Sequence, residues 1–324
     1  MNLEESGKSA EKTAAETEAA DYFKKEIEIS ENHKLKFLSG EAVNLFFHTL
    51  NLYGLLGLHG KTYKSGDSVD VKLRDILKEE PEGGMYERFE QFVRKVVEAD
   101  PKTPEELFAV FSADKYEAAF SEALKKSRES FYGGYWAKNS EKLLNKFMSL
   151  AGSRNWAEEG GKMEKLSGSK FETDFYLIGA EALAESGMYA KPNISIGSME
   201  YSSFFHEGMH LLLKENWAED PRIKSLMPDN WHDPKMWENS WQQKFEQAIV
   251  VALDSLSKNM TKERSYAYFD GCMVGDIKDF FYEPLKDWYE QKMQGREDKK
   301  LEDVIYEILS ANKADLIDKF CNQK

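Results

Sequence analysis

The chain has 324 residues, of which 41% are hydrophobic and 31% are charged. Its 44 Lys and Arg are outnumbered by 58 Asp and Glu, and the formal net charge of −14 repels phosphate backbones. This balance argues against a nucleic-acid-binding protein. The longest apolar runs are far shorter than the about 18 residues that a membrane-spanning helix needs, so we expect no membrane span.

The two cysteines, Cys272 and Cys321, allow at most one disulfide, which excludes a disulfide-stapled scaffold and a cysteine-based zinc module. The first twenty residues are rich in Glu, Ala, Ser and Thr and lack the apolar stretch of a secretory signal. We therefore expect residues 1–22 to be a flexible acidic segment and the protein to be cytoplasmic. A secreted mature chain, numbered after a processed leader, would look the same, so that alternative stays open.

Residues 23–155 are predicted to form a helical region that begins with a short hairpin. Polar and apolar residues alternate over residues 24–30 and 34–38, on either side of a turn. Ser39 is a good helix N-cap, and the apolar residues after it recur at three- and four-residue spacing, which predicts a helix. Further helical patterns, separated by Gly, Pro and Asp, cover residues 85–99, 104–111, 115–131 and 140–150.

Residues 156–324 are predicted to form a second region that contains the catalytic chemistry. The segment 152–169, rich in Gly, Ser and charge, is typical of a loop or soft boundary. Alternating β-branched and aromatic residues predict strands at residues 175–178 and 193–198. Long helices are predicted at residues 203–217, 234–257, 276–293 and 301–320. The sequence thus predicts an α+β fold that is mainly α, with a small sheet.

One motif dominates the chemistry, namely His206-Glu207-Gly208-Met209-His210. Residues four apart share one helical face, so the imidazoles of His206 and His210 can point at one metal ion. Glu207 lies about 100 degrees round the helix, where it can reach a metal-bound water. Zinc with an open coordination position lowers the pKa of its bound water to about 7, and Glu207 can then accept the water proton as general base.

The residues around the motif favour a metal site over two ordinary core or surface histidines. Phe204, Phe205, Met209 and Leu211 flank the motif and predict a buried helix. Histidines and a glutamate placed in a buried helix need partners, and a bound cation supplies them.

The motif resembles the active-site helix of the zincin metallopeptidases, in which H-E-x-x-H follows a substrate-binding edge strand. The resemblance implies that residues 193–199 form this edge strand. It does not extend to the metzincin branch, because no third histidine follows in register. It is closest to the gluzincin branch, whose third zinc ligand is a glutamate on a later helix.

Within that resemblance, Glu246 is the best-placed third ligand for zinc. It lies in a long helix between apolar neighbours, where an isolated buried glutamate would otherwise be neutral or paired. Glu238, which a helix dipole would also explain, and His232 are the alternatives. Asp254 is a candidate to orient a ligand imidazole. Gluzincins also use a Tyr or His to stabilise the oxyanion, and the sequence does not rank the candidates Tyr266, Tyr268, Tyr282 and His232.

The resemblance implies a zinc-dependent peptidase that acts on a peptide or protein substrate. In this hypothesis His206, His210 and Glu246 hold Zn²⁺, and Glu207 activates the water. Two alternatives remain open, a zincin-scaffold hydrolase of a non-peptide amide and a catalytically silent zincin-like binding protein. The sequence predicts neither the cleavage specificity nor the oligomeric state.

Overall fold

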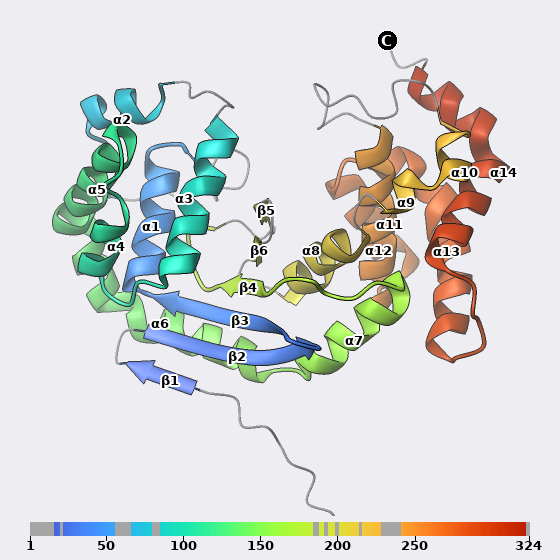
Figure 1. The fold of residues 1–324 in the computed structure, drawn as a ribbon, viewed down its shortest axis with the longest axis horizontal. Helices are drawn as coiled ribbons and strands as arrows, with labels where there is room; N and C mark the ends of the chain where they lie inside the picture. The colour runs from blue at the N-terminus through green and yellow to red at the C-terminus, as the bar shows by residue number, and fades with distance from the viewer. Residues whose placement is uncertain are drawn as a thin grey trace, which may run out of the picture.

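The computed structural model describes residues 16–19, 22–55, 66–79, 85–183, 188–190, 194–197, 201–213, 216–227 and 241–321. In this part of the chain most residues are helical, and one six-stranded sheet runs through the molecule between helices (Figure 1). The predicted class, α+β and mainly α with a sheet, is confirmed.

The strand order of the sheet is β1-β2-β3-β4-β6-β5. The strands are β1 (Glu16–Ala19), β2 (Tyr22–Ser30), β3 (His33–Gly40), β4 (Phe175–Ile178), β5 (Met188–Ala190) and β6 (Ile194–Gly197). β3, β4 and β6 are parallel to one another, whereas β1 pairs antiparallel with β2, β2 with β3, and β5 with β6. The predicted hairpin is confirmed as β2–β3, and Asn32 in its turn takes the left-handed conformation, with φ of 68°.

The helices of the described residues fall into two groups along the chain. The first group is α1 (Glu41–Leu52), α2 (Val71–Leu77), α3 (Met85–Ala99), α4 (Pro104–Val110), α5 (Lys115–Ser127), α6 (Gly133–Gly152) and α7 (Trp156–Ser167). The second group is α8 (Tyr201–Leu213), α9 (Asn216–Glu219), α10 (Pro221–Lys224), α11 (Trp241–Ser257), α12 (Lys262–Gly271), α13 (Lys278–Met293) and α14 (Leu301–Cys321). A π-helical turn at Arg128–Tyr132 joins α5 to α6 without the predicted break.

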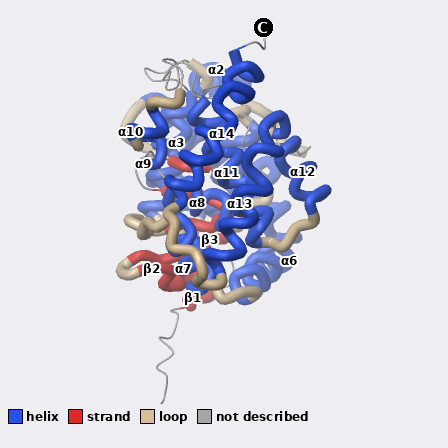
Figure 2. Tube along the Cα trace, turned by 90° about the vertical axis from the view of Figure 1, so that its right-hand side faces the viewer, coloured by secondary structure: helices blue, strands red, loops and turns tan. Residues whose placement is uncertain are grey.

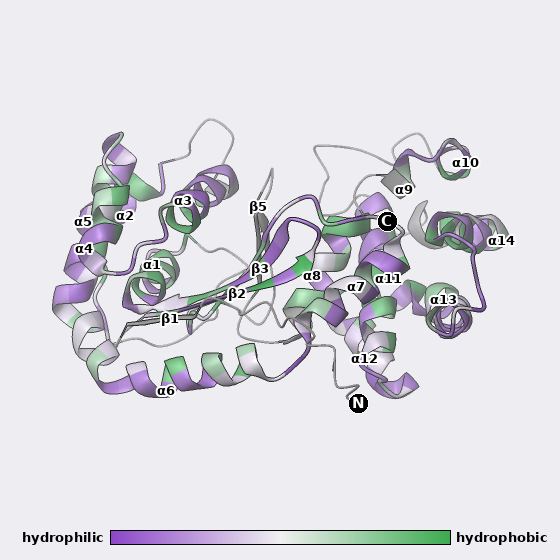
Figure 3. Ribbon diagram, turned by 60° about the horizontal axis from the view of Figure 1, so that its bottom comes forward, coloured by the Kyte–Doolittle hydropathy of each residue, from purple (hydrophilic) through white to green (hydrophobic). Residues whose placement is uncertain are grey.

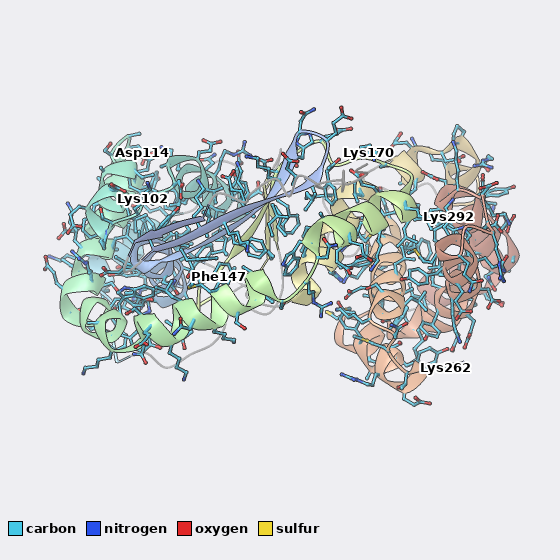
Figure 4. The ribbon with its side chains drawn as sticks, turned by 90° about the horizontal axis from the view of Figure 1, so that it is seen from below. Lys102, Asp114, Phe147, Lys170, Lys262 and Lys292 are labelled. Atoms are coloured by element: carbon cyan, nitrogen blue, oxygen red, sulfur yellow. The ribbon has the colours of Figure 1, made fainter. Side chains whose placement is uncertain are left out.

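Both faces of the sheet are covered by helices. On one face, Phe37 of β3 packs against Phe147 of α6 and Trp156 of α7. Figure 4 labels Phe147 on α6, alongside the strands, and Figure 3 shows hydrophobic and hydrophilic residues interspersed along this amphipathic helix. On the other face, Leu38 and Ile178 lie against side chains of α1 and α3.

The predicted loop at residues 152–169 is wrong, because α7 occupies most of it. Asn155 caps this helix by accepting a hydrogen bond from the backbone N–H of Glu158 at 3.3 Å, and Trp156 and Met163 are buried. Gly160 lets the helix approach β2 closely, since a Cβ at this position would lie 2.8 Å from the carbonyl oxygen of Ile29. Burial of one helical face therefore outweighs the local loop-like composition.

Two further expectations for the N-terminal region are corrected. Ser39 is not a helix cap, because it lies within β3, Gly40 is the N-cap of α1, and the Ser39 hydroxyl donates to the carbonyl oxygen of Gly179 at 2.7 Å. The flexible segment does not extend to residue 22, since Glu16–Ala19 pairs with β2 and Tyr22 is buried. Backbone pairing at the sheet edge and burial of an aromatic ring stabilise these residues. Residues 1–15 lie outside the described residues.

The sheet crosses the expected division between residues 155 and 156. β3 comes from the first region and pairs in parallel with β4 of the second, with Phe37 opposite Leu177. One connected set of buried hydrophobic residues likewise includes side chains from both regions. Among the described helices, none has the length and apolar character needed to cross a bilayer.

The edge strand expected at residues 193–199 is also corrected. β6 covers Ile194–Gly197 but lies inside the sheet, between β4 and β5. The edge on this side is β5, the short strand antiparallel to β6. The sequence pattern cannot distinguish an edge strand from an inner one when both are this short.

Candidate metal centre

The motif helix α8 is held in place by aromatic packing on the sheet. The ring of Phe204 lies 5.1 Å from that of Phe175 on β4 and 5.6 Å from that of Trp156 on α7, measured between ring centroids. Gly208 faces α7, where an added Cβ would lie 2.9 Å from Sδ of Met163. The glycine in the motif thus allows close packing of α8 on α7.

Helix α11 packs on α8, α12 and α13 and brings its polar residues to the motif. Figure 1 shows α8, α11 and α13 in the right-hand half of the molecule, and Figure 2 views this half face-on. His206 is 9% exposed, and the ring centroids of His206 and His210 are 5.0 Å apart. The two histidines therefore share one face of α8, as their spacing predicts.

Both imidazoles direct their Nε2 atoms at one side chain, the amide of Gln247 on α11. Nε2 of His210 lies 3.0 Å from Oε1 of Gln247, and Nε2 of His206 lies 3.2 Å from Nε2 of Gln247. Gln247 is not among the candidates that the sequence provides. The only signal for it is its position as the last polar residue before the apolar run at residues 248–253.

Glu246, the predicted third ligand, lies beside His210. Its Oε1 is 2.6 Å from Nδ1 of His210, and its side chain is partly buried. The structure thus brings His206, His210 and Glu246 together, with the carboxylate on the ring nitrogen that faces away from Gln247. Binding of Glu246 to the same ion as the two Nε2 atoms would require its side chain to rotate, so its role as a ligand stays a prediction.

Behind His206 lies a chain of hydrogen bonds that ends in a buried ion pair. Nδ1 of His206 is 3.0 Å from the hydroxyl of Tyr268 on α12, and this hydroxyl donates to Oδ2 of Asp254 at 2.9 Å. Lys258, one helical turn after Asp254 on α11, donates to the same oxygen at 2.6 Å. Asp254 is expected from the sequence to orient an imidazole, and the structure places it one hydroxyl away from His206. Lys258 is an addition that the sequence does not indicate.

The surroundings shift the pKa values of the two histidines in opposite directions. Burial lowers the pKa of His206 well below its usual value, and the positive charges of His210 and Lys258 lower it further. Burial also acts to lower the pKa of His210, but the hydrogen bond to Glu246 and the charges of Glu246 and Glu207 outweigh it and raise this pKa. His206 is therefore neutral at pH 7, which is the form that binds a metal ion.

The hydrogen-bond partners of the two histidines determine which ring nitrogens carry a hydrogen. Assigned from the hydrogen-bond partners, Nδ1–H of His210 donates to Glu246 and Nδ1–H of His206 donates to Tyr268. Nε2 of His206 then accepts from the amide N–H of Gln247. Nε2 of His210 faces the carbonyl oxygen of Gln247, which calls for a second hydrogen on His210, the charged form that its raised pKa favours. A metal ion between the rings would take the place of that hydrogen, and two neutral imidazole nitrogens are common metal ligands, so the donor set fits a metal ion.

No group of three or more His, Cys, Asp or Glu side chains in the described residues already surrounds one point as metal ligands do. The arrangement is thus two imidazole nitrogens and an amide, with a carboxylate one ring away. Glu207 is half-buried, and its negative charge contributes to the raised pKa of His210.

The other sequence candidates are placed less centrally or lie outside the described residues. Glu238 and His232 lie outside the described residues. The hydroxyl of Tyr266 donates to Asp279 at 2.9 Å in an exposed position, and Tyr282 packs against Tyr266. Of the tyrosines considered as oxyanion donors, Tyr268 alone has a described contact with a motif histidine.

Comparison of the chain with protein-family models, with curated proteins and with solved structures finds no match. The function must therefore be argued from the site itself.

Proposed function

We propose that this protein is a zinc-dependent peptidase of the gluzincin type. The observation that carries the proposal is the convergence of Nε2 of His206 and Nε2 of His210 on one side chain, the amide of Gln247. The neutral state of buried His206 supports it, because a ligand imidazole must be unprotonated on the binding nitrogen.

His206 and His210 would hold the ion, with Glu246 as the third ligand after rotation of its side chain. Zinc, when bound, would supply a Lewis acid and lower the pKa of water to about 7. Glu207, on the same helix and next to His206, would accept a proton from the attacking water and pass it to the leaving amine. Its half-buried position is compatible with this exchange between site and solvent.

The end of the sheet supports a peptide as substrate. β5 is an edge strand, and the chain continues from β5 through β6 to the motif helix α8. An edge strand offers backbone N–H and C=O groups to an extended peptide, which can pair with it as an added strand. The proposed peptide-binding strand is therefore β5 in place of the residues 193–199 expected from the sequence.

The test uses the purified full chain and its Glu207→Gln variant. We expect protein purified without added metal to contain zinc by elemental analysis, and a peptide-library digest to show cleavage. Glu207→Gln should retain the zinc and lose about 10²- to 10⁴-fold in rate, the usual contribution of a general base. An Asp279→Asn variant, changed on the exposed partner of Tyr266, is the matched control and should cleave like the unmodified chain.

Four results would contradict the proposal. A protein without bound metal would remove the zinc site, and full activity of Glu207→Gln would remove the general base. Turnover of small amides with no peptide cleaved would replace the peptidase by a hydrolase of non-peptide amides. A zinc-loaded protein that hydrolyses neither would be a silent binding protein.

A further inference from the structure

We propose that Tyr268 is a positioning residue for His206. Its hydroxyl, anchored by Asp254, holds the imidazole with its hydrogen on Nδ1 and its lone pair on Nε2, toward Gln247. The consequence for metal binding rests on the proposed function, whereas the position of the hydrogen does not.

The direction of each hydrogen bond follows from what the partners can donate. Oδ2 of Asp254 receives the Lys258 ammonium at 2.6 Å, which keeps this oxygen an acceptor. Tyr268 has one hydroxyl hydrogen and gives it to the same oxygen at 2.9 Å. The hydroxyl oxygen can then only accept from Nδ1 of His206, 3.0 Å away, so that nitrogen carries the hydrogen.

One helix fixes both nitrogens of the His206 ring. Gln247 and Asp254 are seven residues apart on α11 and therefore lie on the same face of it. Gln247 reaches Nε2 directly, and Asp254 reaches Nδ1 through Tyr268. Asp254 is fully buried, so loss of its hydrogen-bond partners would leave a buried carboxylate unsatisfied and lower the stability of the fold.

The same hydrogen bonds make Tyr268 unsuitable as an oxyanion donor. A donor to a developing oxyanion needs a hydrogen that is free to point at the substrate. The single hydroxyl hydrogen of Tyr268 is committed to a buried carboxylate on the side of His206 away from Gln247. Tyr268 therefore acts through His206 and does not contact the reacting atoms.

The variant Tyr268→Phe removes the hydroxyl and keeps the ring. The matched control is Tyr266→Phe on the same helix, two residues away and so about 200 degrees round it, where the hydroxyl bonds Asp279. The measurements are the tautomer of His206 by nitrogen-15 NMR of the metal-free protein, the zinc affinity by competition with a chelator, and kcat and KM for any peptide cleaved.

In the unmodified chain we expect His206 with its hydrogen on Nδ1. In Tyr268→Phe we expect both tautomers and a zinc affinity lower by about 10- to 100-fold, as for other groups that orient a metal-binding histidine. Tyr266→Phe should change neither. If a peptide is cleaved, kcat should fall with little change in KM at saturating zinc.

The proposal is overturned if unmodified His206 carries its hydrogen on Nε2, a result that does not depend on whether any variant folds. It is also overturned if a folded Tyr268→Phe keeps both the tautomer and the zinc affinity. Absence of peptide cleavage, with the tautomer and affinity results as expected, would reject the peptidase function and leave the positioning role standing.

Discussion

Two neighbouring residues of α11 each contact a different ring nitrogen of His210. Glu246 contacts Nδ1 and Gln247 contacts Nε2, so the carboxylate can orient the ring while the amide lies on the side where a metal ion would bind. The two side chains are adjacent in sequence, so only substitution of each in turn separates their roles.

We expect Glu246→Ala to lower the zinc affinity by at least about 10-fold, because it removes either a ligand or the group that orients His210. Elemental analysis and competition with a chelator measure the effect. Glu283→Ala, at an exposed glutamate paired with Lys262, is the control and should bind zinc normally. Unchanged zinc content and affinity in Glu246→Ala would reject Glu246, and loss in Gln247→Ala alone would assign the third position to the amide.

Glu164 on α7 gives a residue-scale prediction for stability. Its side chain accepts hydrogen bonds from Ser30, Lys170 and the backbone N–H of Phe171. Burial alone raises the pKa of Glu164, but these hydrogen bonds outweigh burial and hold the pKa below its ordinary 4.5. The carboxylate therefore adds stability above pH 4.5 that is lost as the pH falls through the lowered pKa.

Glu164→Gln should lower the free energy of unfolding at pH 7 by about 1 to 3 kcal/mol and weaken its dependence on pH below 4.5. Urea titrations at several pH values measure both effects. Glu158→Gln, on the same helix with a side chain that is 59% exposed, should change stability by less than about 0.5 kcal/mol. Equal effects of the two substitutions would refute the role of the buried network.

Local spacing in the sequence predicts part of the site. Residues four apart on a helix must share a face, so the motif alone is enough to pair His206 with His210. Glu246 stands out as a charge among apolar neighbours, and the structure places it against His210. The sequence cannot select Tyr268 among 15 tyrosines, because its contact depends on how α12, a helix that the sequence pattern does not predict, packs on α11.

At the scale of elements, α7 shows how tertiary packing overrides composition. Its Gly-rich sequence favours a loop, yet the helix forms because its buried face packs on β2 and α8. Helix α3 is predicted to the residue, since its own apolar periodicity carries the signal.

The adjacent glycines of α7 provide a matched pair of substitutions. Gly160→Ala should destabilise the fold by about 1 to 3 kcal/mol, because the new Cβ would press against backbone atoms of Ile29. Gly161→Ala meets nothing within 4 Å and should stabilise the helix by about 0.5 to 1 kcal/mol. Thermal and urea unfolding of both variants measure the difference, and a stabilised Gly160→Ala would contradict the close approach of α7 to β2.

For the whole molecule, the shared sheet and core predict one cooperative unit. Unfolding followed by far-ultraviolet circular dichroism and by tryptophan fluorescence should give coincident transitions. A fragment of residues 1–155 should not fold, because β3 would lose its partner β4 and Phe37 its contact with Trp156. A fragment that unfolds cooperatively, or two separate transitions in the full chain, would show that the regions are independent.

The groups that align the motif imidazoles all come later in the chain than the motif. Glu246 and Gln247 follow His210 by 36 and 37 residues, and Tyr268 follows His206 by 62. During synthesis, His206 and His210 therefore leave the ribosome before the residues that contact their rings. The ring contacts that would align the two histidines for a metal ion should therefore be complete only once α12 has left the exit tunnel.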